Sequence, residues 1–455
     1  MRKKKWRKIL LEFRKRNNGS GGSHLKDWQK AYQEKRMLAA EALQAVQSGN
    51  RVVSGNACGE PAHLMEALVA RADELENVEV THMLAMGAAA YAQPGMEKSF
   101  YHNALFVGGP TRKAVAENRG DYTPCFFSEI PRLFKNRILP VDVALIQVST
   151  PDDEGFCSYG VSVDYTMAAA ESANTVIAQV NSHCPRTGGA KIHVDQMDAI
   201  VEWDQPLIEL KPPVITPLEE KIGQHVASLV QDGATLQLGI GAIPDAVLLF
   251  LKEKKDLGIH SEMFSDGVVA LAEAGVITNA KKTLNPGKFM ATFLMGTKKL
   301  YDFVDGNPDV EMHPVEYINS PWIVGQHENM VSINSALQVD LMGQVNAEMI
   351  GARQFSGIGG QVDFVRGVSL AKNGVSIIAL PSTASKGTIS RITCELDRGA
   401  AVSTSRNDVH YVVTEFGIAN LRGKSLRERA EALIQIAHPD FRESLKEEAI
   451  ALGRI

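Results

Sequence analysis

The sequence predicts an α/β protein made of two similar open domains, each with a mainly parallel sheet. Short runs of Val, Ile and Leu alternate with helical patterns along the chain, which is typical of strands covered by helices on both faces. The pattern V-Q-x-G-x5-G also occurs twice, at residues 46–55 and 230–239. A glycine-containing turn, a proline and an apolar helix follow each copy, so we interpret the two halves as an internal duplication.

The individual elements follow from the local patterns. Short apolar runs indicate strands buried on both faces, and longer stretches indicate helices. Strands are expected at residues 51–53, 78–81, 143–148, 175–180, 235–238 and 376–380, and helices at 27–46, 61–71, 244–255 and 425–438. Pro244 suits the first turn of its helix, because the N–H that proline lacks would have no intrahelical partner there.

The best domain boundary is the segment 211–217, KPPVITP, whose three prolines favour an extended connection. It separates an expected N-terminal domain, residues 25–211, from an expected catalytic C-terminal domain, residues 212–455. The two are of similar length, as a duplication requires.

Composition restricts the class of protein. The 455 residues are 44% hydrophobic and 22% charged, which is ordinary for a globular protein and argues against a disordered, collagen-like or coiled-coil chain. No apolar run reaches the roughly 18 to 20 residues that cross a bilayer. The five cysteines form no CxxC pair and the twelve histidines form no HxH or HxxxH pair, so we expect a reducing cytoplasm and neither a disulfide framework nor a metal site.

The first residues carry an unusual charge. Residues 1–16 contain nine Lys or Arg and one Glu, so this segment carries +8 and the rest of the chain −13. A basic segment with apolar residues could bind nucleic acid or an acidic membrane surface, or act in targeting. Because the Gly/Ser-rich residues 17–24 follow it, we interpret residues 1–24 as a tag or extension without a role in chemistry.

A glycine turn between a strand and a helix, residues 236–247, is the first candidate for ligand binding. Gly239 and Gly241 would let a ligand approach the main chain, and the N–H groups at the helix N-terminus attract anions. The third glycine of the dinucleotide fingerprint is absent, because Pro244 occupies its position. A plain tight turn explains this segment about as well.

A second glycine cluster lies at residues 356–363, SGIGGQVD. With glycine at 357, 359 and 360, the exposed main chain could present N–H groups to a developing negative oxygen. The structural alternative is a sharp turn between two buried elements.

A carboxylate lies between these clusters. Glu262 stands among Met263, Phe264 and further apolar residues, and a carboxylate in an apolar site can act as a base or as a covalent nucleophile. The alternative is a glutamate that points to solvent at a strand end. A loose alignment of the two halves places His82 near the Glu262 position, so only the second half has this carboxylate.

Three further residues are candidates of lower rank. Lys386 could bind a phosphate, although a solvated loop lysine is the commoner case. Asn319 and Glu415 could hydrogen-bond a substrate carboxylate or orient Glu262, and structural hydrogen bonding explains each equally well.

Together these motifs resemble the class I CoA-transferases, in particular the 4-hydroxybutyrate and butyryl-CoA:acetate CoA-transferase branch of the acetyl-CoA hydrolase/transferase family. The resemblance extends from about Trp28 to the C-terminus. It depends on residues 54–61 (SGNACGEP), 185–187 (PRT), 192–194 (IHV), 238–244 (LGIGAIP), 260–263 (HSEM), 357–361 (GIGGQ) and 414–417 (TEFG).

The resemblance implies a ping-pong CoA-transferase in which Glu262 forms a glutamyl-CoA thioester. It implies that the N–H groups of Ile240 and Gly360 stabilise the oxyanion. The expected CoA-binding residues are Gly239, Ile240, Gly241, Ala242, Ile243, Gly359, Gly360 and Lys386. CoA and acyl-CoA are then substrates rather than a permanently bound cofactor, the acceptor is a short-chain carboxylate such as acetate, and neither nucleic acid nor membrane is a partner. The resemblance also implies a homodimer or larger homo-oligomer.

Asn56 departs from the branch, which often has histidine in S-G-H-A-C-G-E-P. Since this loop is expected near the carboxylate pocket, the departure bears on the choice of acceptor. Two alternatives stay open at this point: an acyl-CoA hydrolase on the same fold, and a non-catalytic ligand-binding regulator whose basic arm contacts nucleic acid. The acidic body of the chain argues against the regulator.

Overall fold

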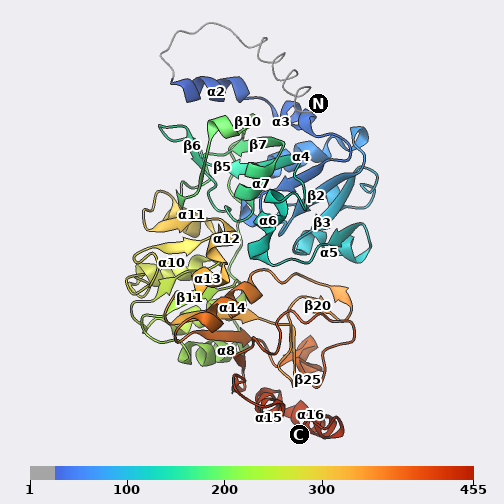
Figure 1. Cartoon of the computed structure of the whole chain (residues 1–455), viewed down its shortest axis with the longest axis vertical. Helices are drawn as coiled ribbons and strands as arrows, with labels where there is room; N and C mark the ends of the chain where they lie inside the picture. Colours follow the sequence, from blue (N-terminus) through green and yellow to red (C-terminus); the bar gives the residue numbers. More distant parts are fainter. Residues whose placement is uncertain (1–25) are drawn as a thin grey trace. The chain divides into compact units, whose positions relative to one another are not determined.

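The computed structural model describes residues 26–455, so the predictions for residues 1–24 lie outside the described part (Figure 1). The chain forms two compact units. Unit 1 contains most of the first half, up to Ile208, together with Val304–Pro308. Unit 2 contains Glu209–Phe303 and Asp309–Ile455 together with Pro124–Glu129. Each unit thus includes a short segment from the other half of the sequence.

Unit 1 is built on a seven-stranded parallel sheet in the order β10-β7-β5-β1-β2-β3-β4. Its strands are β1 Arg51–Ser54, β2 Val78–His82, β3 Phe100–Ala104, β4 Gly120–Tyr122, β5 Val143–Val148, β7 Thr175–Val180 and β10 Ala199–Glu202. Every residue of β5 and β7 is buried, as expected for strands covered on both faces. The four strands predicted in this half are confirmed.

The α-helices of unit 1 are α2 Asp27–Lys35, α3 Ala39–Ala42, α4 Ala62–Val69, α5 Gly109–Ala116, α6 Ile130–Lys135 and α7 Thr166–Ser172, and a small antiparallel pair joins β6 Phe156–Ser158 to β9 Lys191–His193. The continuous helix predicted over residues 27–46 is wrong. Arg36 is extended and forms a bridge to Ile200, and the Met37 N–H donates to the Ile200 carbonyl at 2.9 Å. Pairing with the edge of the sheet therefore overrides the local helical pattern.

Unit 2 is built on a mixed sheet in the order β15-β13-β11-β17-β22-β26-β27, with β12 also paired to β11. The strands are β11 Thr235–Leu238, β12 Gly258–Ile259, β13 Met263–Phe264, β15 Phe293–Leu294, β17 Met330–Ser335, β22 Val375–Ala379, β26 Tyr411–Thr414 and β27 Gly417–Asn420. The predicted strand at 235–238 is confirmed, and that at 376–380 lies one residue earlier. Smaller strands are β14 Phe289–Ala291 with β16 Val310–Met312, β18 Gln338–Asp340 with β19 Val345–Asn346 and β25 Ile392–Thr393, β20 Met349–Ile350 with β21 Arg353–Gln354, and β23 Thr383–Ala384 with β24 Ile389–Ser390.

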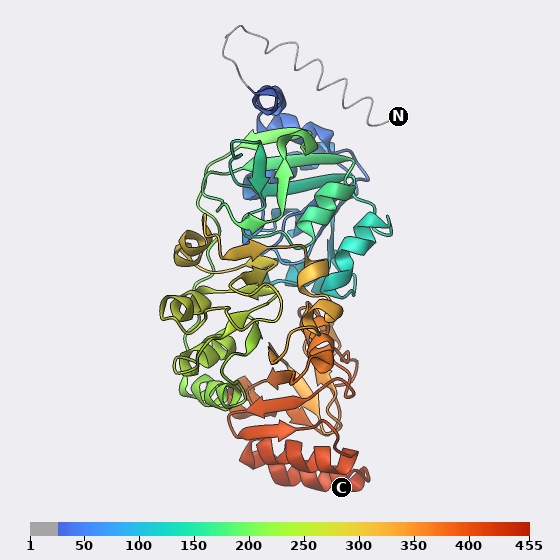
Figure 2. The same ribbon diagram turned by 60° about the vertical axis from the view of Figure 1, so that its left-hand side comes forward.

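The α-helices of unit 2 are α8 Pro217–Ser228, α9 Ala242–Phe250, α10 Asp266–Glu273, α11 Lys298–Val304, α12 Val315–Ile318, α13 Pro321–Val324, α14 Gln361–Leu370, α15 Leu426–Ile436 and α16 Pro439–Ala451. The helix predicted at 244–255 begins two residues earlier and ends at Phe250. Figure 2 shows α15 and α16 side by side next to the last strands of the sheet, where Val412, Leu433 and Leu445 belong to one buried core. No helix within residues 26–455 has the length and apolar composition that a membrane span requires.

The two repeated sequence motifs lead into equivalent strands. In unit 1, β1 lies between the next strand, β2, and β5, and the order continues through β7 to β10. In unit 2, β11 lies between the next strands, β12 and β13, and β17, and the order continues through β22 to β26. A duplicated fold has this matched order, and it places the turns after β1 and β11 in corresponding positions.

Candidate active site

The main chain at Glu262 is fixed by three strands. Glu262 directly precedes β13, which pairs with β11 on one side and with β15 on the other. Its carbonyl accepts hydrogen bonds from the N–H groups of Thr292, at 3.0 Å, and Phe293, at 3.2 Å. The half-buried side chain therefore extends from a well-anchored position.

Asn319 holds the carboxylate of Glu262. The Asn319 Nδ2 group, at the end of α12, donates to Glu262 Oε2 at 2.8 Å, and Asn319 is fully buried. The ring of His260 fixes α12 in turn, because its Nε2 lies 2.8 Å from the Ile318 carbonyl. A carbonyl can only accept, so Nε2 carries the proton, and burial lowers the His260 pKa well below its usual value.

Gly360 completes this group. A Cβ atom at position 360 would lie 1.9 Å from Glu262 Oε2 and 2.2 Å from Asn319 Nδ2. Any side chain would therefore displace the carboxylate or the amide, and only glycine fits without rearrangement. The structure thus brings together three residues that the sequence singled out: Glu262, Asn319 and Gly360.

The main-chain N–H groups of Ile240 and Gly360 have no hydrogen-bond partner within residues 26–455. Ile240 lies in the turn after β11, and Gly360 is the N-cap of α14. At Gly241, the N-cap of α9, φ is +115° and a Cβ atom would meet nothing within 4 Å. Both turns therefore offer donors to a ligand, as an oxyanion site requires.

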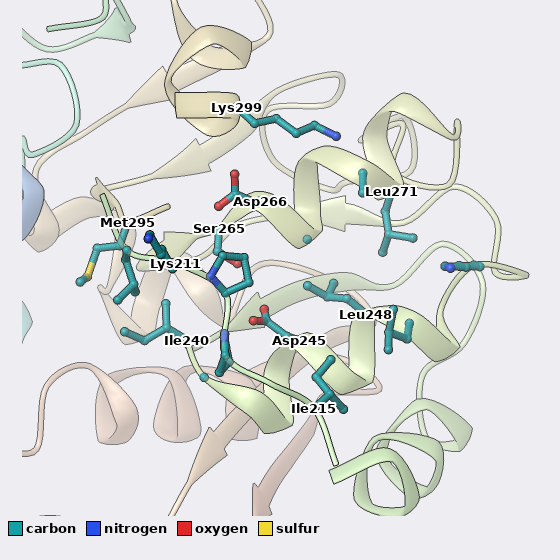
Figure 3. A pocket seen from close by; sticks show the side chains of 18 of the residues that line it. Lys211, Ile215, Ile240, Asp245, Leu248, Ser265, Asp266, Leu271, Met295 and Lys299 are labelled. Carbon is teal, nitrogen blue, oxygen red and sulfur yellow. The ribbon is translucent and has the colours of Figure 1, made fainter. Parts of the chain in front are cut away.

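A pocket of about 450 Å³ opens beside the turn after β11. Figure 3 shows Ile240 and Met295 on one side of it and Leu248 and Leu271 on the other. Its other lining residues come from the segment 210–215, from one face of α9, from α10 and from Lys299. The lining is mainly apolar, so this pocket suits an uncharged or aliphatic part of a ligand.

Charged groups surround the apolar part of the pocket. Lys211, Lys252 and Lys299 supply positive charge, and Lys299 also pairs with Glu273 at 2.8 Å. Burial raises the pKa of Asp245 above its usual value, and nearby Asp266 raises it further. These carboxylates disfavour a phosphate in the middle of the pocket, so we expect anionic ligand groups near the lysines.

Two predicted residues do not join this group. Glu415 accepts hydrogen bonds from the Ser382 N–H, at 2.9 Å, and from Ser382 Oγ, at 2.6 Å, and therefore anchors the chain after β22 instead of contacting Glu262. Lys386 is exposed in the turn between β23 and β24 and does not line the pocket. Its role in phosphate binding stays a prediction.

Sequence reasoning missed a segment and a carboxylate. In the segment 124–129, the Phe127 N–H donates to the Gly359 carbonyl at 3.3 Å. The next residue, Ser128, donates to Asp363 through its N–H, at 3.0 Å, and through Oγ, at 2.8 Å. Asp363 belonged to the quoted glycine cluster, whereas no local pattern marks Ser128 as its partner.

Burial raises the pKa of Asp363 to about 6. Hydrogen bonds from Ser128 and Asn319 oppose this rise, and the charge of Glu129 adds to it. Asn319, which donates to Glu262, also lowers the pKa of Asp363.

In unit 1, the side chains at the corresponding positions form hydrogen bonds with other residues of the same unit. Asn56 donates through Nδ2 to Asp164 Oδ2 at 3.1 Å and accepts from the Leu84 N–H at 3.1 Å. His82 is buried, contacts the Tyr91 hydroxyl and has a strongly lowered pKa because of burial. Within unit 1, these groups form part of the packed interior.

Comparison with known proteins identifies the family of this chain. Residues 21–210 match the acetyl-CoA hydrolase/transferase N-terminal domain, and residues 296–449 match the C-terminal domain of the same family. The chain is 61% identical to 4-hydroxybutyrate coenzyme A transferase of Clostridium kluyveri, over 93% of this chain and 99% of that protein.

Two solved structures show the same fold. One is a 4-hydroxybutyrate CoA-transferase from Porphyromonas gingivalis, with 46% identity, a TM-score of 0.82 and coverage of 93% of this chain and 100% of that one. The other is RipA from Yersinia pestis, with 38% identity, a TM-score of 0.90 and coverage of 94% and 100%. The predicted α/β fold and enzyme class are confirmed. The chain therefore belongs to the acetyl-CoA hydrolase/transferase family and is a CoA-transferase.

Proposed function

We propose that this enzyme transfers CoA between a short-chain acyl-CoA, of the 4-hydroxybutyryl or butyryl type, and acetate or a similar small carboxylate, with Glu262 as the covalent catalyst. The observation that carries the proposal is the group formed by Glu262, Asn319 and Gly360. The carboxylate lies against Gly360, whose main-chain N–H has no partner within residues 26–455. The names of the relatives support the choice of acyl groups.

The reaction begins when a Glu262 oxygen attacks the acyl-CoA carbonyl. The C–S bond breaks, and the products are an acyl-glutamyl anhydride and CoA thiolate. The thiolate then attacks the glutamyl carbonyl, which forms a glutamyl-CoA thioester and releases the first carboxylate. The acceptor carboxylate reverses the two steps, so the kinetics are ping-pong and no water or proton is consumed.

Each attack places negative charge on a carbonyl oxygen. The N–H groups of Ile240 and Gly360 are the donors that we assign to these oxyanions, because neither has another partner in the described residues. A carboxylate is a weak nucleophile toward a thioester, so the hydrogen bond from Asn319 also matters, since it fixes the direction of attack.

The pocket beside Ile240 is the place that we assign to the pantetheine arm of CoA. This arm is uncharged and narrow, as the apolar lining requires, and the phosphates of CoA would lie toward Lys211, Lys252 or Lys299. Lys386 is the alternative phosphate contact. Charge reversal of one lysine at a time, with CoA affinity as the measurement, separates these two arrangements.

The test of the covalent role is capture of the intermediate. Enzyme is incubated with acetyl-CoA and then with borohydride, which reduces a glutamyl thioester, and the modified peptide is located by mass spectrometry. We expect the modification at Glu262 only after acyl-CoA is added, and none in a Glu262→Gln variant. Modification of another residue, or its absence in active enzyme, would contradict the mechanism.

Three finer points belong to the same proposal. Hydrolysis is the alternative outcome of the thioester, and CoA release without a carboxylate acceptor measures it. A cytoplasmic location fits the five free cysteines. We also retain the prediction of a homodimer or larger homo-oligomer, which light scattering tests.

A further inference from the structure

His260 and Glu262 lie two residues apart in the segment that joins β12 to β13. The His260 N–H donates to the Leu236 carbonyl at 3.1 Å, and His260 also pairs with Met290 of β14. This pairing keeps the segment extended. Successive side chains of an extended chain point to opposite faces, so the side chains of His260 and Glu262 share one face.

Both side chains contact the end of the short helix α12. The last residue of this helix is Ile318, and its C-cap is Asn319. His260 Nε2 lies 2.8 Å from the Ile318 carbonyl oxygen, and Glu262 Oε2 accepts from Asn319 Nδ2 at 2.8 Å. Two residues on one face of the segment therefore hold two consecutive residues at the end of α12.

The contact from His260 supplies a donor that α12 itself lacks. The carbonyl groups in the last turn of a helix have no intrahelical partner, and α12 is a single turn of four residues. Ile318 is fully buried, so its carbonyl depends on a donor from the protein. Loss of the His260 Nε2–H group would leave this carbonyl unpaired, one peptide bond away from Asn319.

The His260 ring has little freedom to move. It is fully buried, and its centroid lies 4.5 Å from that of His327 and 6.4 Å from that of Phe364. Its Nδ1 atom has no hydrogen-bond partner in the described part of the chain, so the contact with Ile318 sets the direction of the ring. Phe364 belongs to α14, which begins directly after Gly360. The ring thus contacts α14 as well as α12.

We propose that His260 is a positioning residue for CoA transfer: through the Ile318 carbonyl, it keeps Asn319 in the place from which Nδ2 donates to Glu262. This inference depends on the proposed covalent role of Glu262. His260 touches neither substrate nor the reacting atoms in this scheme, because its ring is buried against α12. Its effect passes through a single peptide unit to Asn319.

The test compares two side chains of equal length at position 260 in the intact enzyme. His260→Met removes the donor, whereas His260→Gln retains an amide Nε2 that can donate to the Ile318 carbonyl. We expect His260→Met to lower the rate of glutamyl-CoA formation at saturating acyl-CoA about 10- to 100-fold, the scale for displacement of a positioning group, and His260→Gln to recover most of this loss. KM for acyl-CoA should change less than about threefold in both variants, because the pocket and the turns that we assign to CoA remain.

A double-mutant cycle shows whether the effect passes through Asn319. In an Asn319→Ala background, His260→Met should lower the rate no further than about twofold. Equal losses with and without Asn319, no loss from His260→Met, or a loss that His260→Gln does not reduce would each overturn the proposal. If His260→Met does not fold by circular dichroism, His260→Asn takes its place, because its shorter amide does not reach the Ile318 carbonyl.

His102→Met in unit 1 is the matched control for loss of a buried imidazole. His102 is 1% exposed, and its Nδ1 lies 3.0 Å from the Val80 carbonyl oxygen. We expect this variant to have a lower thermal midpoint but a rate within about twofold of wild type, and a rate loss equal to that of His260→Met would count against the proposal. Capture of the Glu262 adduct in wild-type enzyme is a separate result, so failure of this inference and failure of the covalent mechanism are distinguishable.

Discussion

The turns after β1 and β11 occupy equivalent places in two similar sheets, yet they differ in packing. The turn after β1 is closed, because other residues pack tightly against its glycines, whereas the turn after β11 is open, because its glycines have free space around them. After β1, a Cβ atom on Gly59 would lie 2.4 Å from the Ser162 Cβ, and one on Gly55 would lie 2.7 Å from the Gly59 carbonyl oxygen. After β11, a Cβ atom on Gly239 would have its nearest neighbour at 4.0 Å, and one on Gly241 would meet nothing within 4 Å. The same motif thus uses glycine for tight packing in unit 1 and for access in unit 2.

The side chains near these turns differ in the same way. In unit 1, Asn56 and His82 are satisfied by internal hydrogen bonds. In unit 2, Glu262 is held by Asn319 and lies against Gly360. The comparison shows that the fold alone does not determine where a catalytic site lies. An open turn and a carboxylate held in a fixed orientation determine it.

Of the changes that test this contrast between the two units, replacement of Glu262 should have the largest effect. We expect Glu262→Gln to lower CoA transfer at least about 10³-fold, because the covalent nucleophile is lost. CoA affinity should change little, since the main-chain turns and the pocket remain. Transfer assays and CoA titration check both parts, with the exposed Glu431→Gln on α15 as the matched control. Substantial CoA transfer by the Glu262→Gln variant would show that this carboxylate is not the catalytic feature that distinguishes unit 2 from unit 1.

Adding one methyl group at Gly360 should have the next largest effect. The new Cβ would overlap Glu262 Oε2 and Asn319 Nδ2, and a displacement of about 1 Å at a reacting group costs on the order of 10² in rate. The measurement is kcat for transfer. Gly109→Ala in unit 1, where a Cβ meets nothing within 4 Å, is the control. A kcat within a factor of two of wild type would show that the carboxylate tolerates movement.

One glycine-to-alanine substitution in each turn should separate packing from access. Gly59→Ala must displace Ser162, and overpacking of this kind lowers the free energy of unfolding by about 1–3 kcal/mol. Gly239→Ala has room for the methyl group, so its free energy of unfolding should stay within about 0.5 kcal/mol of wild type. Urea titrations of both variants measure the difference. Equal destabilisation would contradict the contrast between closed and open turns.

The smallest expected effect concerns pH. Because the pKa of Asp363 is raised to about 6 in the folded protein, the native state binds this proton more tightly than the unfolded chain does. The resulting stabilisation is fully present below the unfolded pKa of about 4 and is lost as pH rises through the folded pKa, by about 1 kcal/mol between pH 5 and 7. Unfolding measured at both values should show this component in wild type and not in Asp363→Asn. An identical pH dependence in the two proteins would contradict the assignment.

Much of the fold could be predicted because its strands are short apolar runs with clear boundaries. β5, β7 and β11 have the predicted bounds. Their residues are buried, so the short run that the sequence shows coincides with the strand. The helix over residues 27–46 could not be predicted, because Arg36 and Met37 pair with a strand more than 160 residues away. Tertiary pairing is invisible to a local pattern.

The residues of the candidate site also differ in whether the local sequence could predict them. Glu262 and Gly360 belong to motifs that mark the family, whereas Asn319 is a candidate of lower rank, and the structure brings the three together. Glu415 carries one too, yet its carboxylate is occupied by Ser382. Ser128 carries none, because its importance arises only from a contact with Asp363, 235 residues later.

Each unit contains a short segment from the other half of the sequence, and this arrangement limits how the gene can recombine. Residues 124–129 belong with unit 2, and residues 304–308 belong with unit 1, where the Arg186 N–H donates to Asp305 at 2.8 Å. A recombination event at the proline-rich boundary would therefore separate Asp363 from Ser128 and Arg186 from Asp305. Neither half of the sequence can therefore be exchanged alone without loss of these contacts, and we expect the two halves to be inherited together.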